Sequence, residues 1–211
     1  MARRLERGRT TRYVILGVLN TFGPLSGYGV KQMIAQTIDF MWSESYGQLY
    51  PELKRLAKDR LVRRVSERND NPRGRKTFEI TGSGRRALSA WLRQPPAREL
   101  VRVEHLVKLF FSRAAGVKAS RLQVLAAREK SQARLAQFAA IRAQIESVAE
   151  ASPDFVNWML VLRSGEMQAE MRVRWADEAL ALLAAWERGG AKAVLTTSRA
   201  QANSGRRSGS Q

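Results

Sequence analysis

The sequence predicts a mainly α-helical protein built from two parts, and three observations lead to this prediction. Apolar residues recur at three- and four-residue spacing over most of the 211 residues. Two short segments that favour β-strand, 61–67 and 76–80, lie on either side of a cationic stretch rich in turn formers. Pro95-Pro96 then separates this first part from a second part whose pattern is helical throughout. Because 44% of the residues are hydrophobic, most of the chain can bury a core.

The first part is expected to begin with two helices. A basic N-terminal arm over residues 1–11 precedes a largely apolar helix at 12–22, which Gly23-Pro24 ends. Ser26 can cap the second helix, because its hydroxyl can accept a hydrogen bond from a free N–H of the first turn. Phe40-Met-Trp42 is a candidate for a short extended segment.

The start of the third helix has two interpretations. Ser45-x-x-Gln48 fits a capping box and places the start at Ser45. Pro51 argues for a start nearer Tyr50, because proline removes a backbone donor and crowds the preceding turn. Both starts place Leu53 and Leu56 on one face of the helix.

Two strands and a fourth helix complete the first part. Residues 61–67 and 76–80 favour strand and flank a long cationic loop, so they predict a β-hairpin. Thr81 can cap a fourth helix that runs through Leu92. Three helices followed by strand, loop and strand is the order of a winged helix-turn-helix domain, which we assign to residues 12–94.

The second part, residues 97–188, is expected to be an all-helical dimerisation and effector domain. It contains a short helix over 100–113, a helix opened by Ser120, and a last helix opened by Ser152-Pro153. The two long helices can pack against a partner subunit or against each other as an antiparallel hairpin, and both can hold at once. We expect a homodimer. Residues 189–211 are rich in Gly, Ser and Arg and are interpreted as a disordered basic tail.

The charge distribution indicates where a polyanion would bind. Of the net charge of +18, residues 1–93 hold 19 basic and 8 acidic side chains, residues 94–188 hold 14 and 11, and residues 189–211 hold 4 basic and no acidic ones. Such a field concentrates polyanions, of which nucleic acid is the commonest and an anionic membrane the second. The first part is therefore the expected site of nucleic-acid binding.

Composition excludes several kinds of catalytic and metal site. The chain has no cysteine, so it has no disulfide, thiolate metal site or cysteine nucleophile. The one histidine, His105, excludes multi-histidine metal sites and completes no catalytic constellation. The longest nearly apolar run, 155–162, is far shorter than the ~20 residues that span a bilayer, and no cleavage site follows the apolar run after the basic N-terminus. We expect a cytoplasmic, nucleoid-associated protein that is not an enzyme and uses no metal or cofactor.

Several motifs occur together in the first part: Leu16-Gly-Val-Leu19, Gly23-Pro24-Leu25-Ser26-Gly27-Tyr28, Ser45-Tyr-Gly-Gln-Leu-Tyr-Pro-Glu-Leu53 and Arg75-Lys76-x-Phe78-x-Ile80-Thr81. Over residues 12–93 they resemble the PadR family of bacterial transcriptional regulators. Leu162-Arg163-x-Gly165 and Trp175 are similar to the family branch with a large helical C-terminal domain. The resemblance implies a dimer joined by its C-terminal helices, and repression that a ligand or stress relieves.

The expected partner is double-stranded operator DNA, because a helix-turn-helix presents the start of its third helix to the major groove. Gln48 is expected to read a base edge, whereas Lys54 and Arg55 suit phosphates. Tyr28 suits packing with a hydroxyl that reaches phosphate, and Tyr50 is either half-buried in the core or a DNA contact. The full set of expected DNA-binding residues is Tyr28, Ser45, Tyr46, Gln48, Tyr50, Lys54, Arg55, Arg68, Arg73, Arg75 and Lys76.

A small aromatic effector is a further partner that the sequence allows. Trp158 and Trp175 could line a pocket for a flat ligand, or could pack in the core or the dimer interface. The function we expect is a sequence-specific transcriptional regulator acting as a ligand- or stress-relieved repressor. The alternative is a non-specific nucleoid-associated or RNA-binding protein, which the arginine-rich ends of the chain favour.

Overall fold

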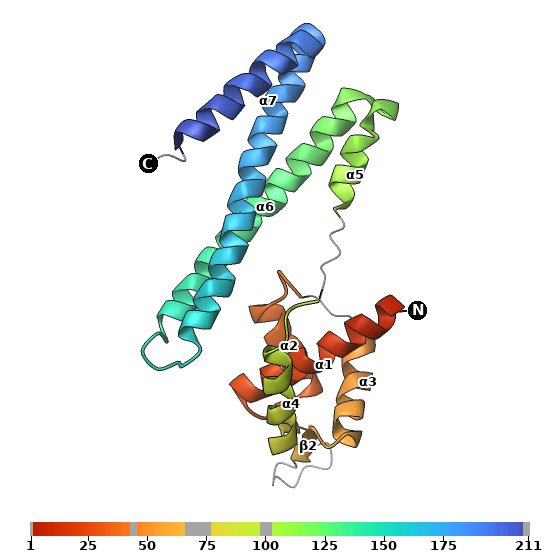
Figure 1. Cartoon of the computed structure of the whole chain (residues 1–211), viewed down its shortest axis with the longest axis vertical. Helices are drawn as coiled ribbons and strands as arrows, with labels where there is room; N and C mark the ends of the chain where they lie inside the picture. Colours follow the sequence, from red (N-terminus) through yellow and green to blue (C-terminus); the bar gives the residue numbers. More distant parts are fainter. Residues whose placement is uncertain (1, 43–45, 66–76, 98–102, 209–211) are drawn as a thin grey trace. The chain divides into compact units, whose positions relative to one another are not determined.

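The computed structural model describes residues 2–42, 46–65, 77–97 and 103–208. They form two compact units, Met1–Glu99 and Leu100–Gln211 (Figure 1). The first unit contains α1 (Ala2–Phe22), β1 (Leu25–Ser26), α2 (Gly27–Thr37), α3 (Tyr46–Lys58), β2 (Val62–Val65), β3 (Thr77–Ile80) and α4 (Gly82–Leu92). The second contains α5 (Glu104–Phe110), the 3-10 turn η1 (Ser112–Ala114), α6 (Gly116–Glu146) and α7 (Phe155–Ser208).

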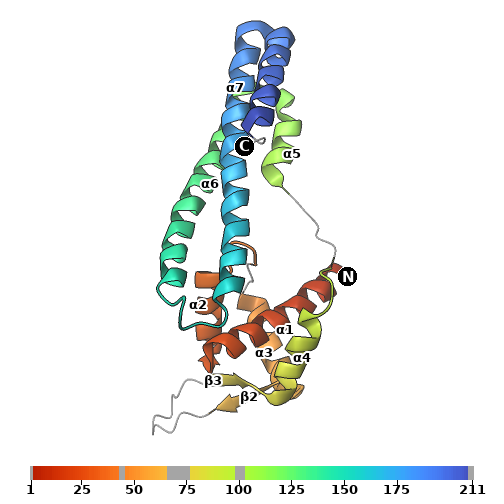
Figure 2. The same ribbon diagram turned by 60° about the vertical axis from the view of Figure 1, so that its left-hand side comes forward.

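The sheet of the first unit is small and antiparallel, with the strand order β1-β3-β2. Leu25 lies opposite Phe78, and Val62 lies opposite Ile80. Val62, Phe78 and Ile80 are buried, whereas Arg63 on the alternate face is exposed. This alternation is what a sheet with one face on a core requires, and Figure 2 shows β2 and β3 side by side at the edge of the helices.

The core of the first unit joins all four helices to the sheet. Tyr13 of α1 stacks on Trp91 of α4 with 4.7 Å between ring centroids, which fixes the first and last helices together. The buried apolar residues are Ile15, Leu16, Val18, Leu19, Val30, Ile34, Leu49, Leu53, Leu56, Val62, Phe78, Ile80 and Leu88.

The helix ends that the sequence predicts in this unit are largely confirmed. α1 ends at Phe22, before Gly23 with a φ of +80°. Ser26 accepts a hydrogen bond from the Gly29 N–H at 3.0 Å, and Thr81 accepts one from the Gly84 N–H at 3.0 Å. Each cap satisfies a first-turn donor that has no partner inside its helix.

Three expectations about this unit were wrong in detail. α1 already begins at Ala2, because good helix formers fill most of residues 2–11, so the expected N-terminal arm is helical. Phe40–Trp42 is not extended, since the Met41 and Trp42 N–H groups donate to the Ile38 carbonyl in a turn. Pro51 lies inside α3, whose start is at Tyr46 and not near Tyr50; the buried leucines on this helix outweigh the backbone bond that proline removes.

The second unit is dominated by the antiparallel hairpin of α6 and α7 (Figures 1 and 2). Three arginines of α6 pair with acids of α7 along its length: Arg121 with Glu187 at 2.6 Å, Arg128 with Asp177 at 2.6 Å, and Arg142 with Glu166 at 2.7 Å. Between the helices lie the buried side chains Val124, Ala127, Phe138, Leu162, Ala169 and Ala176. The intramolecular packing of the two long helices is therefore observed.

The ends of the two long helices differ slightly from expectation. α6 begins at Gly116, four residues before Ser120, and Gly116 itself has a φ of +78°. α7 begins at Phe155, two residues beyond Pro153, with the Asp154 N–H donating to the Ser152 hydroxyl at 3.3 Å. Among the described helices, none has a stretch long and apolar enough to cross a membrane.

The expectation of a disordered tail from residue 189 was wrong for the part that the structure describes. α7 is interrupted at Gly189 and Gly190, where Gly190 has a φ of +59°, and helix then continues to Ser208. Alanines and Leu195 at the start of this stretch favour helix. The Gln201 side chain also donates to the Glu178 carbonyl at 3.2 Å, which ties the returning helix to the preceding one.

Candidate nucleic-acid interface

α3 presents two chemically different faces. Leu49, Leu53 and Leu56 are each at most 2% exposed, because their three- and four-residue spacing places them all on the core side. The other side carries exposed polar and cationic residues, namely Gln48, Tyr50, Lys54, Arg55 and Lys58. The buried leucines therefore fix which side chains the helix offers to a partner.

A buried carboxylate anchors the same helix to α1. Glu52 is 6% exposed and accepts a hydrogen bond from Arg55 at 3.1 Å. Arg12 of α1 places its Nε 4.0 Å from Glu52 and donates to Asp59 at 2.8 Å. Because a buried charge is costly without a partner, these arginines compensate Glu52 and hold α3 in one orientation. The sequence did not predict this role of Arg12, because Arg12 and its partner Asp59 are 47 positions apart in the chain.

Tyr50 has features of both roles expected for it, packing in the core and contact with DNA. Its side chain is 45% exposed, yet its ring covers Gly27, where an added Cβ would lie 2.6 Å from Cε1. Tyr28, the next residue of α2, is 48% exposed. The close approach at Gly27 therefore brings both tyrosines to the junction of α2 and α3, each with a large part of its side chain accessible.

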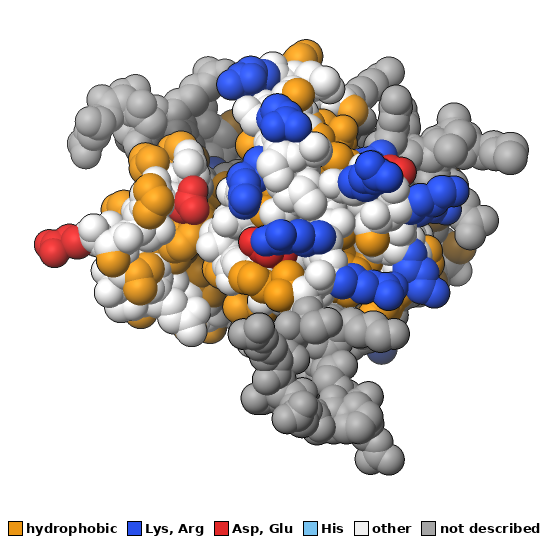
Figure 3. Space-filling view, turned by 90° about the horizontal axis from the view of Figure 1, so that it is seen from below, with side chains coloured by type: hydrophobic (Ala, Val, Ile, Leu, Met, Phe, Trp, Pro, Cys, Tyr) orange, Lys and Arg blue, Asp and Glu red, His pale blue; other side chains and the backbone are white. Residues whose placement is uncertain are grey.

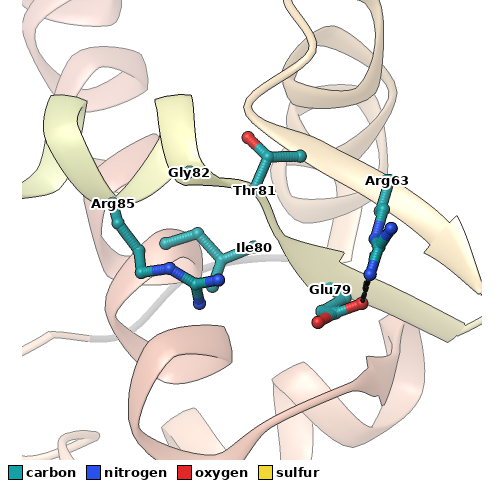
Figure 4. Close-up of a pocket in the computed structure, with 6 residues that line it drawn as sticks. All are labelled: Arg63, Glu79, Ile80, Thr81, Gly82 and Arg85. Carbon is teal, nitrogen blue, oxygen red and sulfur yellow. Dashed lines mark hydrogen bonds and ion pairs between the residues drawn. The ribbon is translucent and has the colours of Figure 1, made fainter.

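A hollow of about 290 Å³ lies at the corner between β2, β3 and α4 (Figure 4). Arg63 and Glu79 face each other across the two strands and pair at 2.9 Å. Arg85 lines the same hollow from the first turn of α4, and its guanidinium makes no hydrogen bond or ion pair with the described residues. A free guanidinium beside a helix N-terminus suits an anion such as a phosphate.

Lysine and arginine side chains are the prevailing charged groups on the surface of the first unit. Figure 3 views it from below and shows them spread over the face, with few acidic groups between them. The exposed cations that α3, β2, α4 and the turn after α3 contribute are Lys54, Arg55, Lys58, Arg60, Arg63, Arg64, Arg85 and Arg86. Of these cations only Lys54 and Arg55 belong to the set expected from the sequence, and the one further signal in the sequence is that Arg60 follows the predicted third helix. Arg60 adopts a φ of +58°, which usually belongs to glycine at such ends.

The structure brings together part of the expected DNA-binding set. Gln48, Tyr50, Lys54 and Arg55 share the exposed side of α3, with Tyr28 on the neighbouring helix. Tyr46 is the first residue of α3. Ser45 and the loop residues Arg68, Arg73, Arg75 and Lys76 lie outside the described residues.

The two tryptophans proposed for an effector belong to α7. Trp158 and Trp175 are both half-buried. Trp175 packs against His105 of α5, with 5.7 Å between the ring centroids and a tilt of 52°. Burial lowers the pKa of His105, and the positive charges of Arg172 and Lys130 lower it further. Trp175 thus joins α5 to α7, which fits the packing role and leaves its effector role a prediction.

The fold and the cationic surface define a class of protein. Three helices, a three-stranded antiparallel sheet and a fourth helix make a winged helix-turn-helix domain, which is followed by a helical unit. No cluster of three or more metal-ligating side chains occurs among the described residues. This is the architecture of a transcriptional regulator.

Comparison with known proteins identifies the family. Residues 15–90 match the family model described as transcriptional regulator PadR-like family, and residues 101–184 match the one described as virulence activator alpha C-term. The negative transcriptional regulator PadR of Bacillus subtilis (strain 168) is 27% identical over 180 residues, which cover 83% of this chain and 98% of that protein. The chain belongs to the PadR family of transcriptional regulators.

Solved structures agree with this assignment. Bacillus subtilis PadR in complex with operator DNA has a TM-score of 0.69 at 27% identity, covering 82% of this chain and 98% of that one. The same protein in complex with p-coumaric acid has a TM-score of 0.65 at 28% identity, covering 83% and 96%. The Vibrio cholerae virulence activator AphA has a TM-score of 0.64 at 30% identity, covering 83% and 98%.

Proposed function

We propose that this regulator binds operator DNA as a homodimer and represses transcription until a small ligand releases it. One observation carries the proposal: α3 exposes Gln48, Tyr50, Lys54 and Arg55 while its leucines are buried. Glutamine can bond the edge of adenine, and the neighbouring cations suit phosphates. The similarity to PadR in complex with operator DNA supports the same partner here. Such a protein would act in the cytoplasm, on the chromosome.

Gln48 and Lys54 should contribute different kinds of binding energy. Losing one good base contact costs about 1–3 kcal/mol on the correct base, whereas losing a phosphate contact weakens binding to every sequence and lowers the salt dependence. We therefore expect Gln48→Ala to narrow the preference for operator over random DNA at an unchanged salt slope. Lys54→Ala should keep the preference and flatten the slope of log K against log salt by about 1 for each contact.

The experiment starts from protection mapping of the DNA upstream of the regulator's own gene. Salt titrations of both variants on the protected site and on random DNA of equal length then separate the roles. Equal affinity of the unaltered protein for both DNAs would favour the alternative, a non-specific nucleoid-associated or RNA-binding protein. Transcription from the protected promoter is then measured with and without the regulator. This separates repression from activation, since AphA is described as a virulence activator.

The effector we propose is a small aromatic acid. The complex of PadR with p-coumaric acid supports this chemical class, and the tryptophans of α7 offer flat apolar surface for such a ring. A ligand of this class should release the operator and change tryptophan emission. If Trp158→Phe and Trp175→Phe proteins remain equally responsive, these residues do not contact the effector.

A further inference from the structure

The helix that follows the break in α7 lies beyond the part of the chain that its relatives match. We call residues 191–208 the C-terminal arm. The family model for the second unit ends at residue 184, and 83% of this chain suffices to cover 98% of Bacillus subtilis PadR. The arm is therefore additional to the unit that those relatives share.

The side of the arm that faces the rest of α7 buries little apolar surface. The chain reverses at Gly190, and the arm returns along the preceding helix (Figures 1 and 2). The Gln201 side chain reaches the Glu178 carbonyl at 3.2 Å. The inward residues Ala193, Val194 and Thr197 are small and only half-buried. Because the stabilisation from burial scales with apolar area, releasing this helix costs little.

The arm carries positive charge without any acidic residue to balance it, unlike the α6–α7 hairpin. In the hairpin Arg121, Arg128 and Arg142 each pair with an acidic residue of the facing helix. In the arm Lys192 and Arg199 are exposed, and no ion pair is recorded for either within the described residues. From residue 189 onward the sequence has four basic residues and no acidic one. The positive charge of the arm is thus available to an outside polyanion.

We propose that the C-terminal arm binds the phosphate backbone of DNA flanking the operator, after releasing from α7 at Gly189 and Gly190. The inference rests on the proposed function, because it supposes that the winged helix occupies an operator. Released and extended, the 21 residues after Gly190 span up to ~70 Å. Contacts of this kind are electrostatic and independent of sequence, so they lengthen the bound site without changing which operator is read.

Duplex DNA fits the arm better than a membrane surface does. Helices that lie on membranes bury a broad face of large apolar residues, commonly Trp, Phe and Leu. Residues 191–208 contain only Val194 and Leu195 as large apolar side chains, and Leu195 is 57% exposed. A phosphate backbone needs cations alone.

The test compares Lys192→Gln/Arg199→Gln with the unaltered chain on two duplexes. One duplex is the protected operator alone, and the other carries about 30 added base pairs on each side. On the long duplex we expect the slope of log K against log salt to flatten by about 2 for each engaged arm, since each phosphate contact contributes about 0.9. On the short duplex the two proteins should have equal slopes. A matched control is Arg113→Gln/Lys118→Gln, which removes two exposed charges from the start of the second unit and should change neither slope.

The outcomes separate this inference from the proposed function. An unaltered protein that does not prefer operator over random DNA contradicts the proposed function. The inference alone is overturned if the unaltered protein prefers the operator, but the unaltered protein and the arm variant have equal slopes of log K against log salt on the long duplex. Vesicles of phosphatidylglycerol and phosphatidylcholine serve as a second probe. If they retain the unaltered protein but not the arm variant, and the DNA slopes are equal, the arm binds membranes and the proposal fails.

Discussion

At the scale of the residue, Gly84 shows how one missing side chain fixes the junction of sheet and helix. A Cβ at this position would lie 2.1 Å from the Leu61 carbonyl oxygen, an atom of the backbone that cannot swing aside. The same carbonyl accepts the Thr81 N–H at 3.0 Å, so it is held in place. The start of α4 can approach the strand only because residue 84 is glycine.

Gly84→Ala should therefore destabilise the protein by about 2–3 kcal/mol, the cost of forcing extra volume into a packed site. The matched control is Gly82→Ala in the same helical turn, where the added Cβ meets only the flexible end of Arg86 at 3.7 Å. That change should be neutral or stabilise by up to ~1 kcal/mol, because alanine favours helix. Urea unfolding of both variants measures the difference, and equal stabilities would contradict the steric explanation.

His105 makes the stability of the second unit depend on pH. Burial and the charges of Arg172 and Lys130 lower its pKa below the ordinary value of 6.5. The unfolded chain then binds a proton more readily than the folded one, so stability is complete above pH 6.5 and is lost as pH falls below it. We expect the melting temperature to decrease between pH 7 and 5.5. His105→Gln should remove this part of the decrease, and an unchanged pH profile would show that other groups cause it.

At the scale of the element, the hairpin of α6 and α7 is aligned by charged pairs as well as by its apolar seam. Glu166 is 8% exposed and accepts hydrogen bonds from Arg142 at 2.7 and 2.8 Å. Arg163 also donates to it, at 3.3 Å. The hydrogen bonds from Arg142 are the main cause that lowers the pKa of Glu166 below 4.5, while burial opposes them.

A carboxylate with a lowered pKa stabilises the fold above its ordinary pKa and loses this effect as pH falls through the folded value. Glu166→Gln should therefore destabilise the protein at pH 7, and the difference from the unaltered protein should shrink below pH 4.5. Glu129→Gln, on the exposed side of α6, serves as the control and should change little at any pH. Thermal unfolding across this range provides the measurement, and a difference that does not shrink as pH falls below 4.5 would contradict the assignment.

The elements that the sequence predicts well are those set by local chemistry. The caps at Ser26 and Thr81 depend on residues three positions apart, and the leucine spacing of α3 depends on helical period alone. Of the two starts that the sequence allowed for α3, the one that Pro51 favoured, near Tyr50, was wrong, because tertiary packing outweighs a local backbone preference. The helix of the C-terminal arm was missed because its glycine, serine and arginine resemble a disordered composition, whereas its hydrogen bond to Glu178 joins residues 23 positions apart. The Arg12–Asp59 pair and the Arg85 hollow likewise arise only when distant segments meet.

At the scale of the whole molecule, the second unit leaves apolar surface uncovered. On α7 the exposed side chains Val156, Leu160, Met167 and Met171 recur at spacings of four, seven and four. This spacing places them on one side of the helix, away from the buried Leu162, Ala169 and Ala176. A sustained exposed stripe of this kind is typical of a helix that packs against another subunit.

The homodimer that we expect should therefore depend on this stripe. Leu160→Glu/Met167→Glu places charges where the partner would pack, and desolvating them opposes association. The variant should be monomeric by light scattering with unchanged helix content. It should also bind a two-fold operator far more weakly, because the second half-site no longer adds to the first. Asn157→Glu/Gln168→Glu adds the same charge at exposed positions beside the stripe and should leave the dimer intact. If both variants stay dimeric, the subunits join through another surface, for which the exposed Phe110 and Phe111 at the end of α5 offer apolar area.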